Sequence, residues 1–207
     1  MTTDPESSAL HPEPPVSVAG SMDDAIRLRA WRDADRGPFA ELNADPEVME
    51  HFPAPLSREQ SDAMVDRIVA HHVERGYGLW ALEVDGRFAG FVGLSTASFP
   101  AQFTPAVEVG WRLARWAWGR GAASTAARRV LRAAPGFGIE EVLSFTATSN
   151  VRSAAVMERI GMARDLDGDF EHPRVPEGSP LRRHVLYRWR STGADEGDTA
   201  GRIPGGE

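Results

Sequence analysis

The sequence has no cysteine among its 207 residues. Disulfide bonds, cysteine-ligated zinc and a cysteine nucleophile are therefore excluded, and acyl transfer through an acyl-cysteine is excluded with them. A block of clustered basic residues is missing too, since 23 basic side chains stand against 30 acidic ones and give a net charge of −7. Because binding to nucleic acid needs clustered positive charge against the phosphates, we expect no nucleic-acid partner.

Long apolar runs are absent as well. No run approaches the roughly 20 apolar residues that a membrane-spanning helix needs. Residues 1–20 carry Asp4, Glu6 and Glu13 and no apolar core, so they do not resemble a signal peptide. We therefore expect a cytoplasmic protein with no membrane partner. We also expect no metal, because the adjacent His71 and His72 would point to different faces of a predicted helix.

The composition fits one globular domain with tails at both ends. Hydrophobic residues make up 42% of the chain and charged residues 26%, which is ordinary for a packed domain. Residues 1–22 are rich in proline, serine and glutamate, and residues 191–207 in glycine and acidic residues. Such compositions predict disorder, which leaves residues 23–190 as the folded domain.

Hydrophobic periodicity predicts a mixed sheet with helices on both faces. Ser57 and Gln60 form a capping-box pattern at one helix start, and Asp85-Gly86 is typical of a tight hairpin. Helices between the later strands call for some parallel pairing. The fold class is α/β (α+β), with six to seven strands and about four helices. Strands are predicted at 26–30, 79–84, 87–95, 106–113, 142–148 and 181–189, helices at 33–43, 57–75, 119–134 and 150–160, and a short seventh strand after Gly161.

A glycine-rich turn joins the strand at 106–113 to the next helix. The segment G-R-G-A-A at residues 119–123 stands where that helix begins. Amide groups at a helix start are unpaired and carry partial positive charge, and small residues let a diphosphate approach them. The segment therefore predicts a diphosphate site, although an ordinary tight strand-to-helix turn would use the same residues.

Two other nucleotide motifs fit this turn poorly. Gly119, Gly121 and Ser124 approach the G-x-G-x-x-G fingerprint of dinucleotide-binding folds, but the third glycine is missing and the strand is the fourth of its chain. A P-loop would need Gly-Lys-Ser/Thr, which does not follow. A nucleotide-linked oxidoreductase is thus the weaker alternative.

Two motifs together resemble a known family. The segment W-G-R-G-A-A at 118–123, preceded by E-V-G-W-R-L at 108–113, resembles the acetyl-CoA motif Q/R-x-x-G-x-G/A of GNAT N-acetyltransferases, with Trp118 in place of Gln or Arg. Residues 148–162 resemble the N-x-x-S…G-[FM] helix of the RimJ/RimL-like branch, and residues 183–189 its last strand. The resemblance covers roughly residues 25–190. It implies the GNAT acyl-CoA N-acyltransferase fold, acetyl-CoA as co-substrate, an amine acceptor and a possible homodimer.

The resemblance also implies a set of cofactor-binding residues. Main-chain amides of the turn would hold the pyrophosphate, and the strand edge before it would pair with the pantetheine arm, with the Leu113 N–H aimed at the oxyanion. Asn150 would contact pantetheine, although it could equally cap its helix. Arg115 and Arg120 could reach phosphates or be solvated. The expected cofactor-binding residues are Trp111, Arg112, Leu113, Gly119, Arg120, Gly121, Ala122, Ala123, Ser124 and Asn150.

Three side chains are candidates for catalysis. Glu108 lies mid-strand on the face opposite Val109, and a carboxylate there is costly to bury without a purpose. It could deprotonate the attacking ammonium or form a salt bridge with Arg112 or another arginine. Ser153 resembles the hydroxyl that protonates the leaving thiolate. Tyr187 could be the acid, or simply a core tyrosine.

These residues predict an N-acetyltransferase in which the amine attacks the thioester directly in a ternary complex. The acceptor would be a protein N-terminus, a peptide or a small-molecule amine, with a wall contributed by the segment around His172 and His184. The competing prediction is a non-catalytic acyl-CoA-binding module of the same fold.

Overall fold

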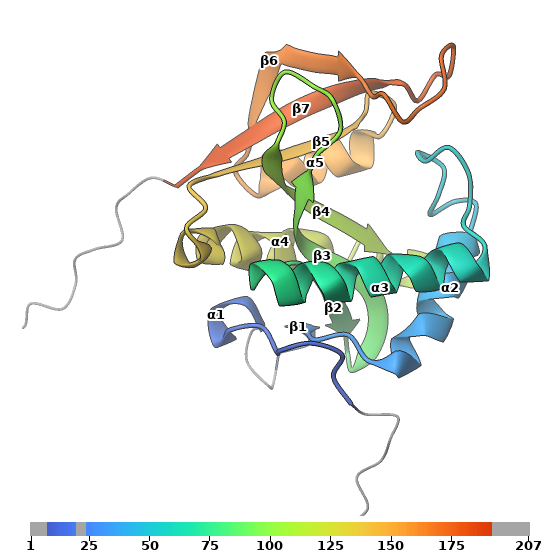
Figure 1. Ribbon diagram of the computed structural model, residues 1–207, viewed down its shortest axis with the longest axis vertical. Coiled ribbons are helices and arrows are strands. Elements are labelled where there is room, and N and C mark those ends of the chain that lie inside the picture. The colour runs from blue at the N-terminus through green and yellow to red at the C-terminus, as the bar shows by residue number, and fades with distance from the viewer. Residues whose placement is uncertain (1–7, 20–23, 192–207) are drawn as a thin grey trace, which may run out of the picture.

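The structure is a computed structural model that describes residues 8–19 and 24–191. One seven-stranded sheet in the order β1-β2-β3-β4-β5-β7-β6 forms its centre, and all neighbours are antiparallel except β4 and β5 (Figure 1). The strands are β1 (Ile26–Arg29), β2 (Leu79–Val84), β3 (Arg87–Ala97), β4 (Ala106–Leu113), β5 (Glu141–Ala147), β6 (Ala163–Glu171) and β7 (Arg183–Arg190). The α-helices are α1 (Val16–Ala19), α2 (Arg36–Ala44), α3 (Arg58–Arg75), α4 (Ala122–Ala133) and α5 (Val151–Arg159).

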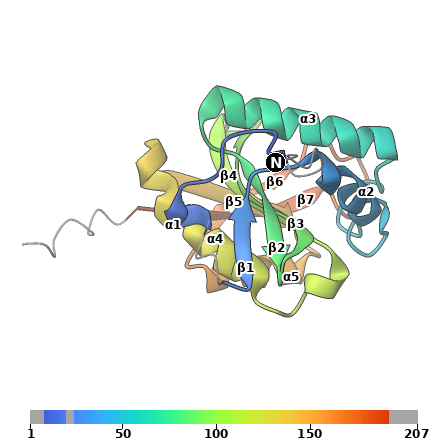
Figure 2. The same cartoon turned by 90° about the horizontal axis from the view of Figure 1, so that it is seen from below.

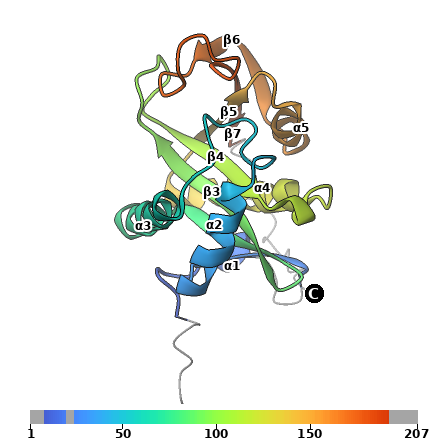
Figure 3. The same cartoon turned by 90° about the vertical axis from the view of Figure 1, so that its right-hand side faces the viewer.

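Helices cover both faces of this sheet, as the sequence predicted. Helix α3 lies on one face and helices α4 and α5 on the other (Figure 3). None of the helices in the described residues has the length and apolar character needed to cross a membrane. Each face has its own apolar core: Val109 and Leu113 of β4 pack toward α4, whereas Phe91 of β3 packs with residues of α2 and α3. Glu108 and Arg112 therefore project toward α3.

Local turn chemistry sets several element boundaries. Asp85 and Gly86 both have positive φ, 52° and 73°, which is the type I′ turn that the sequence predicted. The Ser57 hydroxyl accepts a hydrogen bond from the Gln60 N–H at 3.2 Å, and the Ser57 N–H donates one to the Gln60 side-chain oxygen at 2.8 Å. Helix α3 then ends at Gly76, whose φ is 74°.

Strands β4 and β5 meet at only one point. Their single paired position is Glu108 opposite Leu143, after which the two parallel strands diverge. Strand β5 keeps its other edge paired with β7 over its whole length. Beyond Val109, the edge of β4 that faces β5 is consequently left open, and this gap positions the functional site.

The N-terminal segment departs from the prediction of a disordered tail over residues 1–22. Residues 8–19 pack on the domain: the Leu10 N–H donates to the Trp31 carbonyl at 2.7 Å, and Val18 is fully buried. Helix α1 lies beside α4 (Figure 2). The proline-rich composition alone could not predict this packing, because the surface that residues 8–19 contact forms only when the rest of the domain has folded. The rest of that predicted tail lies outside the described residues, as do residues 192–207.

Two histidines join this segment to α3 and predict a pH-dependent stability. The rings of His11 and His72 are stacked at 3.8 Å, and burial, with His11 adding to it, lowers the His72 pKa to about 4. Between pH 6.5 and about 4, His72 therefore binds more protons in the unfolded chain than in the folded one. As the pH is lowered through this range, the free energy of unfolding should decrease by an amount on the order of 3 kcal/mol. Urea unfolding across this range should show a shallower slope for His72→Gln; an equal slope would contradict the prediction.

Candidate active site

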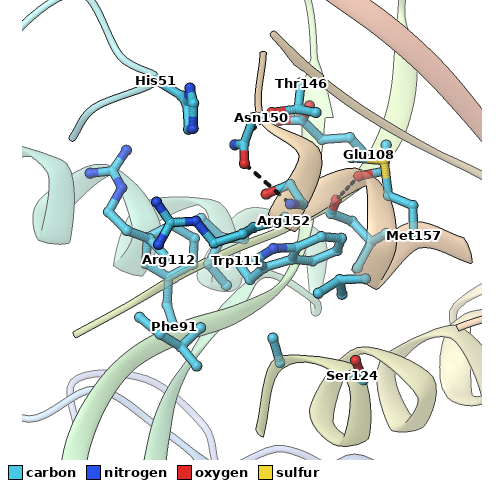
Figure 4. Close-up of a pocket in the computed structure, with 18 of the residues that line it drawn as sticks. His51, Phe91, Glu108, Trp111, Arg112, Ser124, Thr146, Asn150, Arg152 and Met157 are labelled. Carbon is cyan, nitrogen blue, oxygen red and sulfur yellow. Dashed lines mark hydrogen bonds between the residues drawn. The ribbon is translucent and has the colours of Figure 1, made fainter. Parts of the chain in front are cut away.

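A cavity of about 1280 Å³ passes through the gap between β4 and β5. Its lining runs from the turn before α4, along β4 and the start of α5, to the face covered by α3 (Figure 4). In this view Glu108 lies to one side and Arg112 and His51 to the other. The cavity thus joins the predicted diphosphate turn to the predicted base.

The turn before α4 presents a row of free amide groups. Gly119 and Gly121 have φ of 72° and 74°, a region that disfavours residues with a Cβ. The first helical hydrogen bond runs from the Thr125 N–H to the Gly121 carbonyl at 2.9 Å. Within the described chain, the N–H groups of residues 119–124 have no main-chain acceptor. The turn can therefore bind an anion with its backbone.

Main-chain groups of β4 alternate between β3 and the gap. The Ala114 N–H donates to the Ala89 carbonyl at 2.8 Å, so even-numbered residues face β3. The Val109 carbonyl instead accepts from the Ser144 hydroxyl at 3.0 Å across the gap. Trp111 and Leu113 share that direction, and their N–H groups can pair with an extended ligand lying in the gap.

Trp118 closes the end of this edge. Its indole N–H donates to the Leu113 carbonyl at 2.8 Å, which leaves the Leu113 N–H as the polar group available at that position. The guanidinium of Arg152 lies 4.5 Å over the Trp118 ring, so α5 is joined to the strand end. The hydrogen bond to Leu113 and the packing of Arg152 on the ring account for tryptophan at a position where the motif usually has glutamine or arginine.

Asn150 and Ser153 both line the cavity at the start of α5. The Asn150 side-chain oxygen accepts from the Ser153 N–H at 3.2 Å, which is the helix-capping role. Its amide nitrogen donates to the Thr146 hydroxyl at 2.9 Å. The cap holds Ser153 at the cavity surface.

Glu108 lines the cavity at the point where β4 and β5 separate. Its carboxylate accepts a hydrogen bond from the Ser95 hydroxyl at 2.8 Å. Burial raises the pKa of Glu108, while the Ser95 hydrogen bond and the charge of Arg174 oppose that rise. Among the described residues, Glu108 has no ion pair with Arg112 or any other arginine, so the salt-bridge alternative is not what the structure shows.

The Arg112 side chain lies on the same face of β4 and also lines the cavity. It donates to the Asn43 side-chain oxygen at 2.6 Å and lies 4.2 Å over the Phe52 ring. Burial lowers its pKa to about 10. We predicted that the Arg112 main chain binds the cofactor. That main chain instead pairs with β3, and the side chain points toward α3, so the prediction for Arg112 is not supported.

Three predicted side chains lie away from the cavity lining. Tyr187 is 5% exposed, and its hydroxyl donates to Glu158 at 3.1 Å; burial and Glu158 raise its pKa. Arg120 is paired with Asp85 at 2.6 Å, and Arg115 with Asp45 at 2.8 Å. This placement favours the core role for Tyr187 and surface ion pairs for both arginines.

The segment around His172 contributes Arg174, rather than its histidines, to the cavity. The rings of His172 and His184 are 4.9 Å apart within a cluster of phenylalanines. Burial, together with the charge of His184, lowers the pKa of His172 to about 4, and burial lowers the pKa of His184 as well. The histidines thus support this wall of the cavity as neutral rings.

Sequence reasoning missed most of the charge around the cavity. The lining contains six arginines and two glutamates, in a chain whose net charge is −7. A single sequence gives no signal for this, because the arginines come from α3, β4, α4, α5 and the segment before β7. The cavity therefore attracts anionic ligands. The arginines are Arg67, Arg112, Arg128, Arg152, Arg159 and Arg174.

Comparison with known proteins now decides the family. Residues 25–163 match the family model of the acetyltransferase (GNAT) domain. The chain belongs to the GNAT acetyltransferase family. It is therefore an acetyltransferase. The free amides at residues 119–124 suit the diphosphate of a coenzyme A-linked acetyl donor.

Two curated relatives are about one-third identical to this GNAT chain over the residues that align. The uncharacterized protein YkkB of Bacillus subtilis is 32% identical over 149 residues, covering 67% of this chain and 82% of YkkB. The FsC-acetyl coenzyme A-N(2)-transacetylase of Aspergillus fumigatus is 33% identical over 130 residues, covering 58% of this chain and 55% of that enzyme. The chain thus spans about half the length of the fungal relative.

Solved structures share the fold at lower identity. RimL, a ribosomal L7/L12 alpha-N-protein acetyltransferase, has a TM-score of 0.67 at 17% identity, covering 83% of this chain and 93% of RimL. A GNAT-family acetyltransferase from Bacillus anthracis has a TM-score of 0.65 at 19% identity, covering 81% and 95%. These likenesses confirm the predicted GNAT fold of a seven-stranded mixed sheet with flanking helices.

Proposed function

We propose that this GNAT acetyltransferase transfers the acetyl group to a primary amine by direct attack in a ternary complex. The observation that carries the proposal is one continuous cavity that joins the amide row of residues 119–124 to the Glu108 carboxylate. A donor anchored by its diphosphate at that turn would run along the open edge of β4. Its thioester would then reach the point where β4 and β5 meet, beside Glu108.

Glu108 is the proposed base. A lysine-like ammonium has a pKa near ~10.4 and must lose a proton before its nitrogen can attack. Burial raises the pKa of Glu108, and a base with a pKa nearer to neutrality accepts such a proton more effectively. The proton would pass to Glu108 directly or through water, while the Ser95 hydroxyl holds the carboxylate toward the cavity.

Ser153 is the proposed acid. As the nitrogen–carbon bond forms and the carbon–sulfur bond breaks, the departing sulfur needs a proton, and Ser153 is the hydroxyl that the Asn150 cap fixes at the cavity surface. The Leu113 N–H would stabilise the negative charge that develops on the thioester oxygen. Tyr187 has no part in this proposal, because its hydroxyl is bound to Glu158 away from the cavity.

Side chains of α4 and α5 are proposed to bind the phosphates in place of Arg115 and Arg120. Arg128 and Arg159 line the cavity, and Arg128 donates to the Arg159 carbonyl at 2.9 Å, which places the two side by side. Arg152 lies at the start of α5 next to the turn. RimL, which shares the fold, has been solved with coenzyme A, in keeping with a donor in this region.

The acceptor class follows from the motifs and the relatives. The W-G-R-G segment resembles the RimJ/RimL-like branch, and the name of the fungal relative states transfer to an N(2) position. We therefore propose a primary amine on a protein N-terminus, a peptide or a small molecule. The presence of Glu108 and Ser153 in the cavity favours this enzyme over a non-catalytic acyl-CoA-binding module.

Thiol release from acetyl-CoA tests the proposal. The full chain should release free coenzyme A only when a suitable amine is present, across a panel of peptides, amino acids, polyamines and aminoglycosides. Mass spectrometry should find the acetyl group on the amine nitrogen. Binding of acetyl-CoA without thiol release for any amine would identify a binding module instead, and tight binding of NAD(P)H would point to an oxidoreductase.

A further inference from the structure

Arg112 is a partly buried cation with no anionic partner in the described part of the chain. Its Nη1 donates to the neutral Asn43 side chain, and its Nε has no acceptor. Arg29, an arginine that is fully buried, is paired with Asp35 at 2.7 Å and with Glu83 at 3.1 Å. A buried charge is normally compensated in this way. The isolation of Arg112 therefore calls for a ligand.

The surroundings of Arg112 hold its guanidinium in one orientation. Its guanidinium carbon lies 4.2 Å from the centre of the Phe52 ring and 5.7 Å from the centre of the Phe91 ring. The Asn43 side chain that binds Nη1 is itself fully buried and donates to the Ser61 hydroxyl at 2.9 Å. The described residues offer no acceptor to Nε or Nη2; Nε has almost no accessible surface, which leaves Nη2 as the donor that a ligand in the cavity can reach.

Open space separates Arg112 from the proposed base. Glu108, Gly110 and Arg112 alternate on one face of β4, and the strand rise puts the outer two roughly 13 Å apart at their Cα atoms. A Cβ added to Gly110 would meet no atom within 4 Å. A ligand can therefore lie over Gly110 with one end at Glu108 and the other at Arg112.

We infer that the acceptor amine also carries a carboxylate, which binds the free Nη2 of Arg112 while the amine nitrogen lies at Glu108. This inference rests on the proposed acetyl transfer to an amine. A carboxylate fits better than a phosphate, because Arg112 carries one unpaired positive charge and offers one accessible free donor. Arg67 and Arg174, which also line the cavity, favour entry of an anionic acceptor.

Matched pairs of acceptors test this inference on the full chain. The pairs are amino acids with their primary amides, ω-amino carboxylates of increasing length with their amides, and peptides that begin with Asp or Glu against Asn or Gln. Wild-type protein should prefer the acid by about 10- to 100-fold in kcat/KM for at least one pair. The ω-amino carboxylate of the preferred length would show the spacing between the Arg112 guanidinium and the Glu108 carboxylate.

Variants of Arg112 should remove this preference. Arg112→Gln should bring the ratio of acid to amide close to one, chiefly through KM, and leave the Kd for acetyl-CoA unchanged. Arg112→Lys should restore part of the preference, because it keeps the charge but loses the fixed planar geometry of the guanidinium. Arg58→Gln removes an exposed arginine of α3 outside the cavity and should change neither quantity.

The outcomes separate this inference from the proposed function. If wild-type protein acetylates acids and amides equally, or prefers aminoalkyl phosphates to carboxylates, the inference is overturned and the acetyltransferase stands. If no amine releases thiol, the proposed function fails; calorimetry of the same pairs with the coenzyme A complex then still tests Arg112. Loss of the acid preference in Arg58→Gln would also count against it.

Discussion

Replacing Glu108 with glutamine should lower kcat by about 10²-fold or more and leave the Kd for acetyl-CoA unchanged. General-base catalysis contributes on the order of 10²–10⁴ in rate, and an amide of the same shape cannot take the ammonium proton. The Ser95 hydroxyl can still donate to the glutamine oxygen, so the local structure should persist. Steady-state thiol release and calorimetry with acetyl-CoA measure the two quantities.

The pH profile should identify the same group. Burial raises the pKa of Glu108, so activity should rise with pH through a value above that of an ordinary glutamate. Ser95→Ala removes a hydrogen bond that favours the charged carboxylate, and the rising limb should move to higher pH. Glu108→Gln should lose this limb altogether. A variant that keeps the wild-type rate would end the assignment of Glu108 as the base.

Stability should change in the opposite direction to activity. A carboxyl whose pKa is raised in the folded state binds its proton more readily there, so its unfavourable contribution appears as pH rises through the folded pKa. At neutral pH the charged Glu108 therefore destabilises the fold, and Glu108→Gln should unfold at a higher urea concentration than wild type. A loss of stability in return for activity is expected where a buried charge is needed for function.

Much of the fold was predictable because short-range chemistry sets its boundaries. The Asp85-Gly86 turn needs two positive φ values, and the Ser57–Gln60 box satisfies amides at a helix start; both signals lie within four residues of sequence. Strand β6 was predicted only as a short strand after Gly161. It is an edge strand in which no residue is fully buried, and its register is irregular after Asp165, so it lacks a hydrophobic alternation.

The site was predictable in its main-chain part and poorly so in its side chains. Positive φ at Gly119 and Gly121 and the free amides after them follow from small residues before a helix. The free guanidinium donor of Arg112 depends on Asn43 and Phe52, about 60 to 70 positions earlier in the chain. No sequence pattern predicts a contact between residues so far apart in the chain.

A Cβ in the diphosphate turn should weaken acetyl-CoA binding about 10- to 100-fold. Gly121→Ala places a methyl group at the cavity surface beside amides that the proposal assigns to the pyrophosphate, and each charge-assisted hydrogen bond lost there is worth about 1.5–3 kcal/mol. Gly121 has φ of 74°, so the alanine should also cost roughly 1–2 kcal/mol of stability through backbone strain.

Gly138→Ala separates these two effects. Gly138 has the same φ of 74°, and a Cβ on either glycine would meet no atom within 4 Å, yet Gly138 does not line the cavity. Both alanine variants should lose similar stability in urea, but only Gly121→Ala should lose affinity for acetyl-CoA in calorimetry. Gly121→Asn, which tolerates positive φ, should recover stability without recovering affinity. Equal affinities for the Gly121 and Gly138 variants would mean that the diphosphate does not bind at this turn.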